Sequence, residues 1–444
     1  MVVVADRKVC VIGCSVVGLT TGVVLAGLGH RVRLFESDKL RRSIISRGEV
    51  PFYEPGLSTM LAKGIRARRI SVEGDLEKTV DSSDFTFLAV PIPLLKSSSP
   101  NISRLRDAAR SIGGSLRKGG IVVQRTAAPP GTAEELLVPA LESQSGLRAE
   151  RDFGVAVNPV FFSMGTAVRD SLKPSRIVVG GDTRKTAGEV MDLYDRLDAP
   201  KLLTNLGTAE MIKVVSDCFL AAKASLTNEV AGLCERLGVD AEEVMEGVRL
   251  DPRIGEGYTR PSLGFGGCGL PKNLSITISK AESMGLKPEI LRAVRRANDR
   301  QPMRAVQILE DELGNLRGKR IALLGLAFKA GVDDITESRA FPIAVELLAR
   351  GATIVGYDPL AKASFIRALP GIFYASSVQE ALLEADGCVI QTEEEEFSKL
   401  GKSDFDLMGN RLVVDGTRVL PPAKLKKYGV TLRAVGLGTR LKAK

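Results

Sequence analysis

Short apolar runs alternate with amphipathic stretches over most of the chain. A strand-like run at residues 8–12 precedes a glycine-containing turn, a helix-like stretch at residues 19–28 and a second strand-like run at residues 31–35. This order predicts the opening βαβ unit of a doubly wound sheet. No charged residue occurs between positions 9 and 29, as in a signal peptide or a membrane span, but the turn divides this stretch into two elements. We therefore expect no membrane segment.

The same alternation continues toward the C-terminus. Further strand-like runs lie at residues 84–90, 120–124, 153–157 and 176–179, and the pattern restarts at residues 319–325, 352–358, 389–390 and 412–415. Between the two series, residues 208–238 contain no proline and have apolar side chains at about every third or fourth position, which predicts one long helix. We predict an α/β protein with two Rossmann-like doubly wound domains joined by a long central helix and a helical domain. The expected boundaries are 1–202, 203–300 and 301–444, and the central helix is the expected surface of a homodimer.

The composition is typical of a globular protein of this length. The chain has 444 residues, of which 44% are hydrophobic and 26% are charged, and about 150 residues per domain predicts roughly three domains. A formal charge of +9 favours anionic ligands such as nucleotides. The arginine pairs are scattered and lack interleaved aromatic residues, so we expect no nucleic-acid partner.

Histidine and cysteine limit the possible chemistry. The one histidine, His30, excludes mechanisms that need two, and the six cysteines show neither a C-x-x-C pair nor the spacing of a zinc site. We expect no metal site, reduced thiols and a cytoplasmic location.

The first turn has the fingerprint of a dinucleotide-binding site. Gly13 and Gly18 occupy the first and third glycine positions of G-x-G-x-x-G, and Ser15 replaces the middle glycine. Glu36 follows the second predicted strand, where a carboxylate accepts hydrogen bonds from a ribose 2′-hydroxyl. Because an acid at this position favours NAD over NADP, NAD is the expected cofactor.

A series of motifs extends over nearly the whole chain. In order, they are Pro51-Phe52-Tyr53-Glu54-Pro55-Gly56-Leu57, Pro129-Pro130-Gly131-Thr132, Asp170-x3-Pro174-x-Arg176, Ala209-Glu210-x2-Lys213, Asp251-x-Arg253-Ile254, Gly264-Phe265-Gly266-Gly267, Pro271-Lys272, Gly325-Leu326-Ala327-Phe328-Lys329 and Asp333-Asp334. With these motifs the chain resembles the UDP-glucose/GDP-mannose dehydrogenase family. The resemblance implies an enzyme that oxidises the C6 alcohol of a nucleotide sugar to a carboxylate with two NAD, through a cysteine-bound thiohemiacetal and thioester.

The chain departs from the family pattern at the catalytic cysteine. In the motif Gly-Phe-Gly-Gly-Ser-Cys-Phe-Pro-Lys-Asp, the cysteine position is Gly269, the serine position is Cys268 and the aspartate position is Asn273. Cys268 is a candidate nucleophile because it is adjacent to the family's cysteine position. Its role stays open, because one residue of offset turns a side chain by ~100° in a helix. The family's Pro-Glu-Phe-Leu-x-Glu-Gly loses both glutamates, because Val160 and Met164 stand there. Hydrolysis of a thioester therefore lacks its expected carboxylates.

Lys213 and Asp217 form the expected proton-transfer pair. They are four residues apart and so share one helical face, where an exposed ion pair of ~0.3–0.5 kcal/mol is the structural alternative. The resemblance implies a catalytic lysine at Lys213, and Cys268 and Asn273 complete the candidate catalytic set. The residues that it assigns to the cofactor are Gly13, Ser15, Val17, Gly18, Glu36, Arg41, Pro91, Thr126 and Lys272. The residues that it assigns to the substrate are Phe161, Phe162, Lys213, Arg253, Arg260, Phe265, Gly266 and Lys329.

The nucleotide site also departs from the family. Two arginines of its pattern are replaced by Thr336 and Thr417, although Arg418 is adjacent to the second. We predict an NAD-dependent oxidoreductase that acts on a nucleotide sugar and is limited to a two-electron oxidation, or to an oxidation followed by re-reduction. Two alternatives remain, a full four-electron 6-dehydrogenase that uses Cys268 and a catalytically inert nucleotide-binding homologue.

Overall fold

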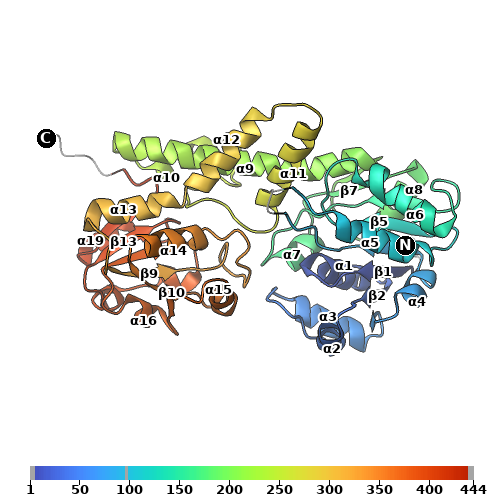
Figure 1. Ribbon diagram of the computed structural model, residues 1–444, viewed down its shortest axis with the longest axis horizontal. Helices are drawn as coiled ribbons and strands as arrows, with labels where there is room; N and C mark the ends of the chain where they lie inside the picture. Colours follow the sequence, from blue (N-terminus) through green and yellow to red (C-terminus); the bar gives the residue numbers. More distant parts are fainter. Residues whose placement is uncertain (1–5, 96–98, 439–444) are drawn as a thin grey trace. The chain divides into compact units, whose positions relative to one another are not determined.

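A computed structural model describes residues 6–95 and 99–438 (Figure 1). The chain forms two compact units. The N-terminal unit comprises residues 1–216 and 275–286, and the C-terminal unit comprises residues 217–274 and 287–444. Each unit contains its own sheet.

The sheet of the N-terminal unit has eight strands among the described residues. These are β1 (Lys8–Ile12), β2 (Arg31–Phe35), β3 (Ile70–Glu73), β4 (Phe85–Leu88), β5 (Ile121–Gln124), β6 (Gly154–Val157), β7 (Ile177–Gly181) and β8 (Lys201–Asn205). Their spatial order is β3-β2-β1-β4-β5-β6-β7-β8. The strands are parallel from β3 to β6, whereas β7 is antiparallel to β6 and parallel to β8. The chain order reverses between β1 and β4, and ligands of doubly wound sheets bind beyond the carboxyl ends of the strands at such a switch point.

Helices cover both faces of this sheet. They are α1 (Val16–Gly27), α2 (Lys39–Ser46), α3 (Leu57–Arg66), α4 (Leu76–Asp81), α5 (Ser103–Gly113), the π-helix η1 (Ala133–Leu137), α6 (Val138–Ser145), α7 (Ala167–Leu172) and α8 (Arg184–Asp192). Apolar side chains of α1, α3, α7 and α8 share one core cluster with the sheet. Those of α4, α5, η1 and α6 share a second cluster, which also takes in the first residues of α9. Because both faces are covered, most residues of the central strands are apolar and buried.

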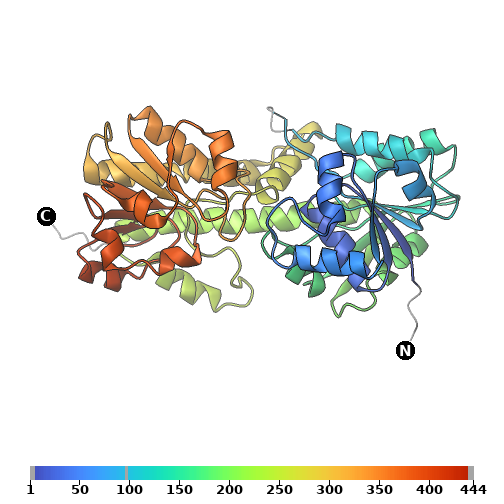
Figure 2. The ribbon, with the colours of Figure 1, turned by 90° about the horizontal axis from the view of Figure 1, so that it is seen from below.

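The predicted long helix is α9 (Leu206–Leu237), and Figure 2 shows it as one continuous element in green. Further helices follow it, α10 (Ala241–Arg249), α11 (Leu270–Ser283), α12 (Glu289–Arg300) and α13 (Met303–Leu313). Among the described residues of α9, Phe219, Leu226 and Leu233 are exposed although they are large and apolar. Their spacing of seven residues places them on one face of the helix.

The second sheet contains the strands β9 (Arg320–Leu324), β10 (Thr353–Tyr357), β11 (Phe373–Tyr374), β12 (Gly387–Ile390), β13 (Leu412–Asp415) and β14 (Thr431–Ala434). Their order is β11-β10-β9-β12-β13-β14, and all the pairs are parallel. The helices of this region are α14 (Ala340–Ala349), α15 (Lys362–Ala368), α16 (Val378–Leu382), α17 (Glu395–Ser398), α18 (Lys402–Phe405) and α19 (Pro422–Lys427).

The predicted fold class is confirmed, because two Rossmann-like sheets occur with a long central helix. The antiparallel junction between β6 and β7 was not predicted, since an apolar run carries no signal for the direction of its strand. The boundaries 1–202, 203–300 and 301–444 stay a prediction. Within the described ranges, no helix is both long and apolar enough to span a membrane.

Candidate active site

The turn between β1 and α1 needs glycine where the backbone is most crowded. Gly13 has a φ of +95°, which favours glycine, and a Cβ added to Gly18 would lie 1.8 Å from the carbonyl oxygen of Gly13. Ser15 precedes the first turn of α1, with Val17 in that turn, and its hydroxyl donates to the carbonyl of Ala89 at 3.3 Å. The backbone N–H groups at the start of α1 are a ready site for a pyrophosphate. The turn therefore fits a dinucleotide.

Glu36 lies directly after β2, at the carboxyl edge of the sheet. Its carboxylate accepts a hydrogen bond from the backbone N–H of Asp38 at 3.1 Å and pairs with Arg41 at 3.4 Å. Arg41 also donates to the carbonyl of Cys14 at 3.0 Å. The pair thus connects the expected ribose-binding acid to the glycine turn, and both residues lie where a cofactor ribose would be held.

Two further predicted cofactor residues lie beyond neighbouring strands. Pro91 follows β4 and is exposed, and Thr126 follows β5. The hydroxyl of Thr126 donates to the carbonyl of Val90 at 2.7 Å, so the two loops are tied together. The structure therefore brings eight of the nine predicted cofactor residues to one edge of the sheet, namely Gly13, Ser15, Val17, Gly18, Glu36, Arg41, Pro91 and Thr126. Lys272 lies in the first turn of α11, at a position that belongs to the C-terminal unit.

A buried carboxylate that the sequence analysis gave no role fastens the loop after β5. Glu210 on α9 accepts hydrogen bonds from the side-chain amide of Gln124 at 2.8 Å and from the backbone N–H groups of Gly131 and Ala133 at 2.6 and 3.0 Å. Burial raises the pKa of Glu210 to about 7, although these three hydrogen bonds act in the opposite direction. Its place in the motif Ala209-Glu210-x2-Lys213 was a signal that the sequence offered.

Lys213 lies one turn further along α9 and contacts an aromatic ring. Its Nζ is 5.7 Å from the centroid of Phe161, and the guanidinium of Arg176 is 3.8 Å from the same centroid. Arg176 also donates to the hydroxyl of Ser216 at 3.0 Å. Two cations thus lie near the ring of Phe161, and aromatic faces attract cations. Phe162 and Val160 lie beside it in the same loop and are half-buried.

Asp217 and Asn273 meet within the C-terminal unit. Both side chains are buried, and the amide of Asn273 donates to the Asp217 carboxylate at 2.5 Å. Tyr258 has a φ of +64°, an uncommon conformation for a bulky residue, and partial desolvation together with the charge of Asp217 raises the pKa of its phenol. The structure brings two predicted catalytic residues into contact and adds Tyr258, for which the sequence gave no signal.

Cys268 and Gly269 immediately precede α11. The side chain of Cys268 is exposed, whereas the other five cysteines, Cys10, Cys14, Cys218, Cys234 and Cys388, are buried. A Cβ added to Gly269 would meet no atom within 4 Å, so a larger residue has room at this position. Burial raises the pKa of Cys14 to about 12, which is typical of an inert thiol.

The glycine-rich loop of the predicted substrate site is fixed in place. The side chain of Asn298 accepts from the N–H of Phe265 at 2.8 Å and donates to the carbonyl of Phe265 at 3.1 Å. A Cβ at Gly266 would lie 2.3 Å from the carbonyl oxygen of Glu337, so the loop packs closely on the chain near residue 337. Arg339 is buried and donates to the same carbonyl, and the sequence analysis did not single it out.

The basic residues of the nucleotide site differ in how accessible they are. Arg253 is 87% exposed and pairs with Asp251, and Arg260 is exposed and 3.8 Å from Glu242. Arg418 is half-buried and forms an ion pair with the N-cap Asp240 of α10 at 2.7 Å. Arg418 is next to Thr417, which stands where the family pattern has an arginine. The structure gives Arg418 a structural ion pair. Lys329 is half-buried in the loop after β9.

Three consecutive regions of the chain match the domains of one family. The NAD binding domain of the UDP-glucose/GDP-mannose dehydrogenase family matches residues 7–198, its central domain matches residues 207–300 and its UDP binding domain matches residues 322–422. The chain belongs to the UDP-glucose/GDP-mannose dehydrogenase family. The first of these domains is an NAD-binding domain, and the protein is an NAD-dependent oxidoreductase of the nucleotide-sugar dehydrogenase type.

Similar proteins cover almost the whole chain. The UDP-glucose 6-dehydrogenase AglM of Haloferax volcanii is 36% identical over 421 residues, which is 93% of this chain and 97% of AglM. The UDP-glucose 6-dehydrogenase TuaD of Bacillus subtilis is 31% identical, and the match spans 97% of this chain and 93% of TuaD. The structure of a UDP-glucose dehydrogenase from Pyrobaculum islandicum is 36% identical, with a TM-score of 0.91 and 99% coverage of both chains.

Proposed function

We propose that this nucleotide-sugar dehydrogenase carries out a two-electron oxidation of its sugar, or an oxidation followed by re-reduction. The observation that carries the proposal is the glycine at position 269, which leaves open space where the family pattern has its cysteine. Without a thiol at this position, the family's route through a thioester lacks its usual nucleophile. Val160 and Met164 also lack the carboxylates that would help water to attack such an ester.

The retained residues support the first half of the reaction. The glycine turn at Gly13 and Gly18 and the acid Glu36 would hold NAD, which when bound accepts the hydride leaving the hydroxyl-bearing carbon. Lys213 and Asp217 lie one turn apart on α9 and are both buried, so either is shielded from bulk water as a proton acceptor for the reacting hydroxyl. The hydrogen bond from the amide of Asn273 fixes the orientation of the Asp217 carboxylate.

The substrate that we propose is a nucleotide sugar. Support comes from the match to a UDP binding domain and from the relatives named as UDP-glucose dehydrogenases. Phe265 and Gly266 in the rigid loop, together with Lys329, Arg253 and Arg260, are the proposed contacts. The two exposed arginines leave their present carboxylate partners at little cost, because surface ion pairs contribute only ~0–1 kcal/mol.

The yield of NADH per sugar tests the proposal. With a panel of UDP- and GDP-sugars, we expect at most one NADH for each sugar consumed. Two NADH for each sugar and a carboxylate product would contradict it and would support the four-electron alternative that uses Cys268. Tight sugar binding without any NADH, and without isotope exchange at the sugar carbon, would support the inert homologue.

The variant Cys268→Ala distinguishes the two-electron reaction from the four-electron reaction that uses Cys268. An exposed thiol with no catalytic role predicts an unchanged kcat, because its removal leaves no cavity in a buried core. A large loss of activity with an unchanged melting temperature would instead assign Cys268 as an offset nucleophile.

We also propose that a second copy of this chain covers the exposed face of α9. Phe219, Leu226 and Leu233 form an apolar row that is unusual on a monomer surface. Light scattering of wild type and of Leu226→Lys tests this assignment. We expect a dimer that the lysine weakens, and a wild-type monomer would contradict it.

A further inference from the structure

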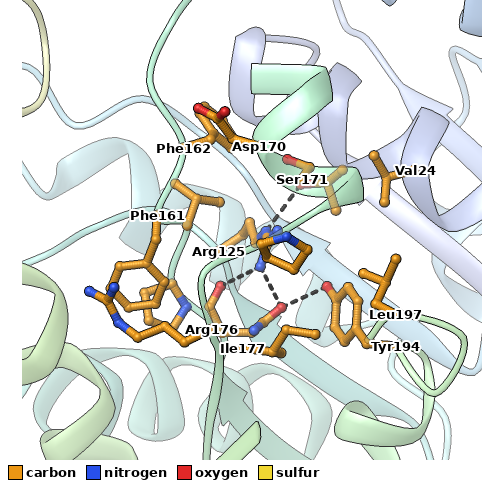
Figure 3. Close-up of a pocket in the computed structure, with 15 residues that line it drawn as sticks. Val24, Arg125, Phe161, Phe162, Asp170, Ser171, Arg176, Ile177, Tyr194 and Leu197 are labelled. Carbon is orange, nitrogen blue, oxygen red and sulfur yellow. Dashed lines mark hydrogen bonds between the residues drawn. The ribbon is translucent and has the colours of Figure 1, made fainter. Parts of the chain in front are cut away.

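A small cavity lies inside the N-terminal unit, behind the loop that carries Phe161. Its volume is about 40 Å³, and its lining comes from α1, the residue after β5, the loop after β6, α7, the start of β7 with the residues before it, and the segment after α8. Figure 3 shows Arg125 at its centre, with Phe161 and Arg176 on one side and Tyr194 and Leu197 on the other. All the lining residues belong to this one unit.

Arg125 brings a positive charge into the cavity. Arg125 is only 8% exposed, and its guanidinium stays protonated at any ordinary pH. Burial lowers the pKa of Arg125, because desolvation disfavours the charged form. A buried charge normally has a charged partner, because its desolvation is costly otherwise.

The partners of this guanidinium are neutral. Nε donates to the hydroxyl of Thr21 at 3.1 Å, and one terminal nitrogen, Nη1, donates to the backbone and side-chain oxygens of Asn158 at 2.9 and 2.5 Å. The ring of Tyr194 lies 6.0 Å from the guanidinium carbon. Over the described ranges, Nη2 makes no hydrogen bond and no carboxylate lies within ion-pair distance of Arg125.

The surrounding hydrogen bonds fix these acceptors in place. The hydroxyl of Thr21 donates to the carbonyl of Val17, and the hydroxyl of Tyr194 donates to the side-chain oxygen of Asn158. The amide nitrogen of Asn158 donates to the carbonyl of Val178, which orients its oxygen toward Arg125. The network therefore satisfies three donors of Arg125 and leaves its charge unbalanced.

The acidic residue in the cavity lining does not supply the missing charge. Asp170 accepts hydrogen bonds from the N–H of Ser163 at 3.2 Å and from the hydroxyl of Thr166 at 2.6 Å. Its other oxygen pairs with Arg169 at 3.3 Å. The carboxylate is thus engaged outside the reach of Arg125.

We propose that this cavity binds a small monovalent inorganic anion such as chloride against Nη2 of Arg125. A volume of about 40 Å³ exceeds the roughly 10–15 Å³ that one water needs and is far too small for a sugar phosphate. The anion would neutralise the buried guanidinium and complete its hydrogen bonding. Val160 and Phe161 line the same cavity, so the anion also stiffens the loop against which Lys213 and Arg176 pack.

Thermal melting in different salts tests the site. We compare sodium chloride and sodium bromide with sodium gluconate, whose anion is too large for the cavity, at equal ionic strength. The melting temperature of the wild type is expected to rise and then saturate with chloride or bromide but not with gluconate. Arg125→Met is expected to lose this difference, whereas Arg184→Met, which removes an exposed charge of α8 in the same unit, is expected to keep it. The same response in wild type and Arg125→Met would overturn the proposal.

A second measurement on the wild type does not depend on the folding of the Arg125 variant. Crystals grown in bromide are expected to show anomalous scattering within hydrogen-bond reach of Nη2 of Arg125. Absence of that peak, with water alone in the cavity, would overturn the proposal. The Val160→Asp variant offers a further check, because a carboxylate in the lining should replace the anion and remove the chloride dependence.

Discussion

Glu210 gives a sharp prediction about the pH dependence of stability. Its folded-state pKa is about 7 instead of 4.5, because burial disfavours the carboxylate. Between these two values the folded chain holds a proton that the unfolded chain has released. The contribution of Glu210 to the free energy of unfolding must therefore fall as the pH rises from about 4.5 through 7, and the loss is complete just above 7.

The magnitude follows from the same two values. A shift of one pKa unit corresponds to ~1.4 kcal/mol, so Glu210 contributes about 2.5 kcal/mol more stability at pH 5 than at pH 8. Glu210→Gln removes this titration, although its amide nitrogen replaces one acceptor. We expect that substitution to lower stability at pH 5 by roughly 2–4 kcal/mol, because buried donors such as the N–H of Ala133 lose a partner.

Urea unfolding of both chains between pH 5 and pH 8, followed by circular dichroism, measures this difference. The free energy of unfolding of wild type minus that of Glu210→Gln should decrease by about 2.5 kcal/mol over the range, since all other titrating groups cancel. Glu150→Gln, which changes an exposed carboxylate in the same unit, should show no such change. A pH-independent difference between wild type and Glu210→Gln would refute the assignment of a neutral-range titration to this residue.

Three other predictions concern the local geometry and the chemistry. Gly18→Ala should weaken both NAD binding and folding, because the new Cβ would lie 1.8 Å from a backbone oxygen. Gly27→Ala in the same helix should instead add ~0.4–1 kcal/mol of stability. Equal melting temperatures of the two variants would contradict this prediction. Gly266→Ala should cost ~1–3 kcal/mol by overpacking, whereas Gly269→Cys should leave the melting temperature unchanged, and differential scanning calorimetry distinguishes them. Lys213→Met should lower kcat by ~10²–10⁴, and an unchanged kcat would remove Lys213 from the proton transfer.

Much of the fold can be predicted from local patterns of apolar residues and glycines in the sequence. The predicted runs at residues 8–12 and 31–35 coincide with β1 and β2, and the predicted helix at residues 208–238 differs from α9 by one or two residues at each end. Glu36 falls at the carboxyl end of β2, as the fingerprint predicts. These features depend on side-chain periodicity and glycine positions, which are local properties.

The features that escaped prediction depend on contacts between distant residues. Glu210 fastens a loop nearly eighty positions earlier in the chain, and Arg125 is buried by segments that are separated from it along the sequence. Arg418 pairs with Asp240 across 178 positions, which gives it a structural role that its place beside a family motif did not reveal. The direction of β7 likewise depends on its connection to β6 and not on its own residues.

The mass of the sugar product, determined after a complete reaction with NAD in excess, tests the central claim most directly. A thiol-free position at Gly269 predicts a product that has lost two hydrogens, or an epimer of unchanged mass if re-reduction follows. A nucleotide sugar carboxylate, gained with one oxygen from water, would contradict the account and restore the four-electron reaction.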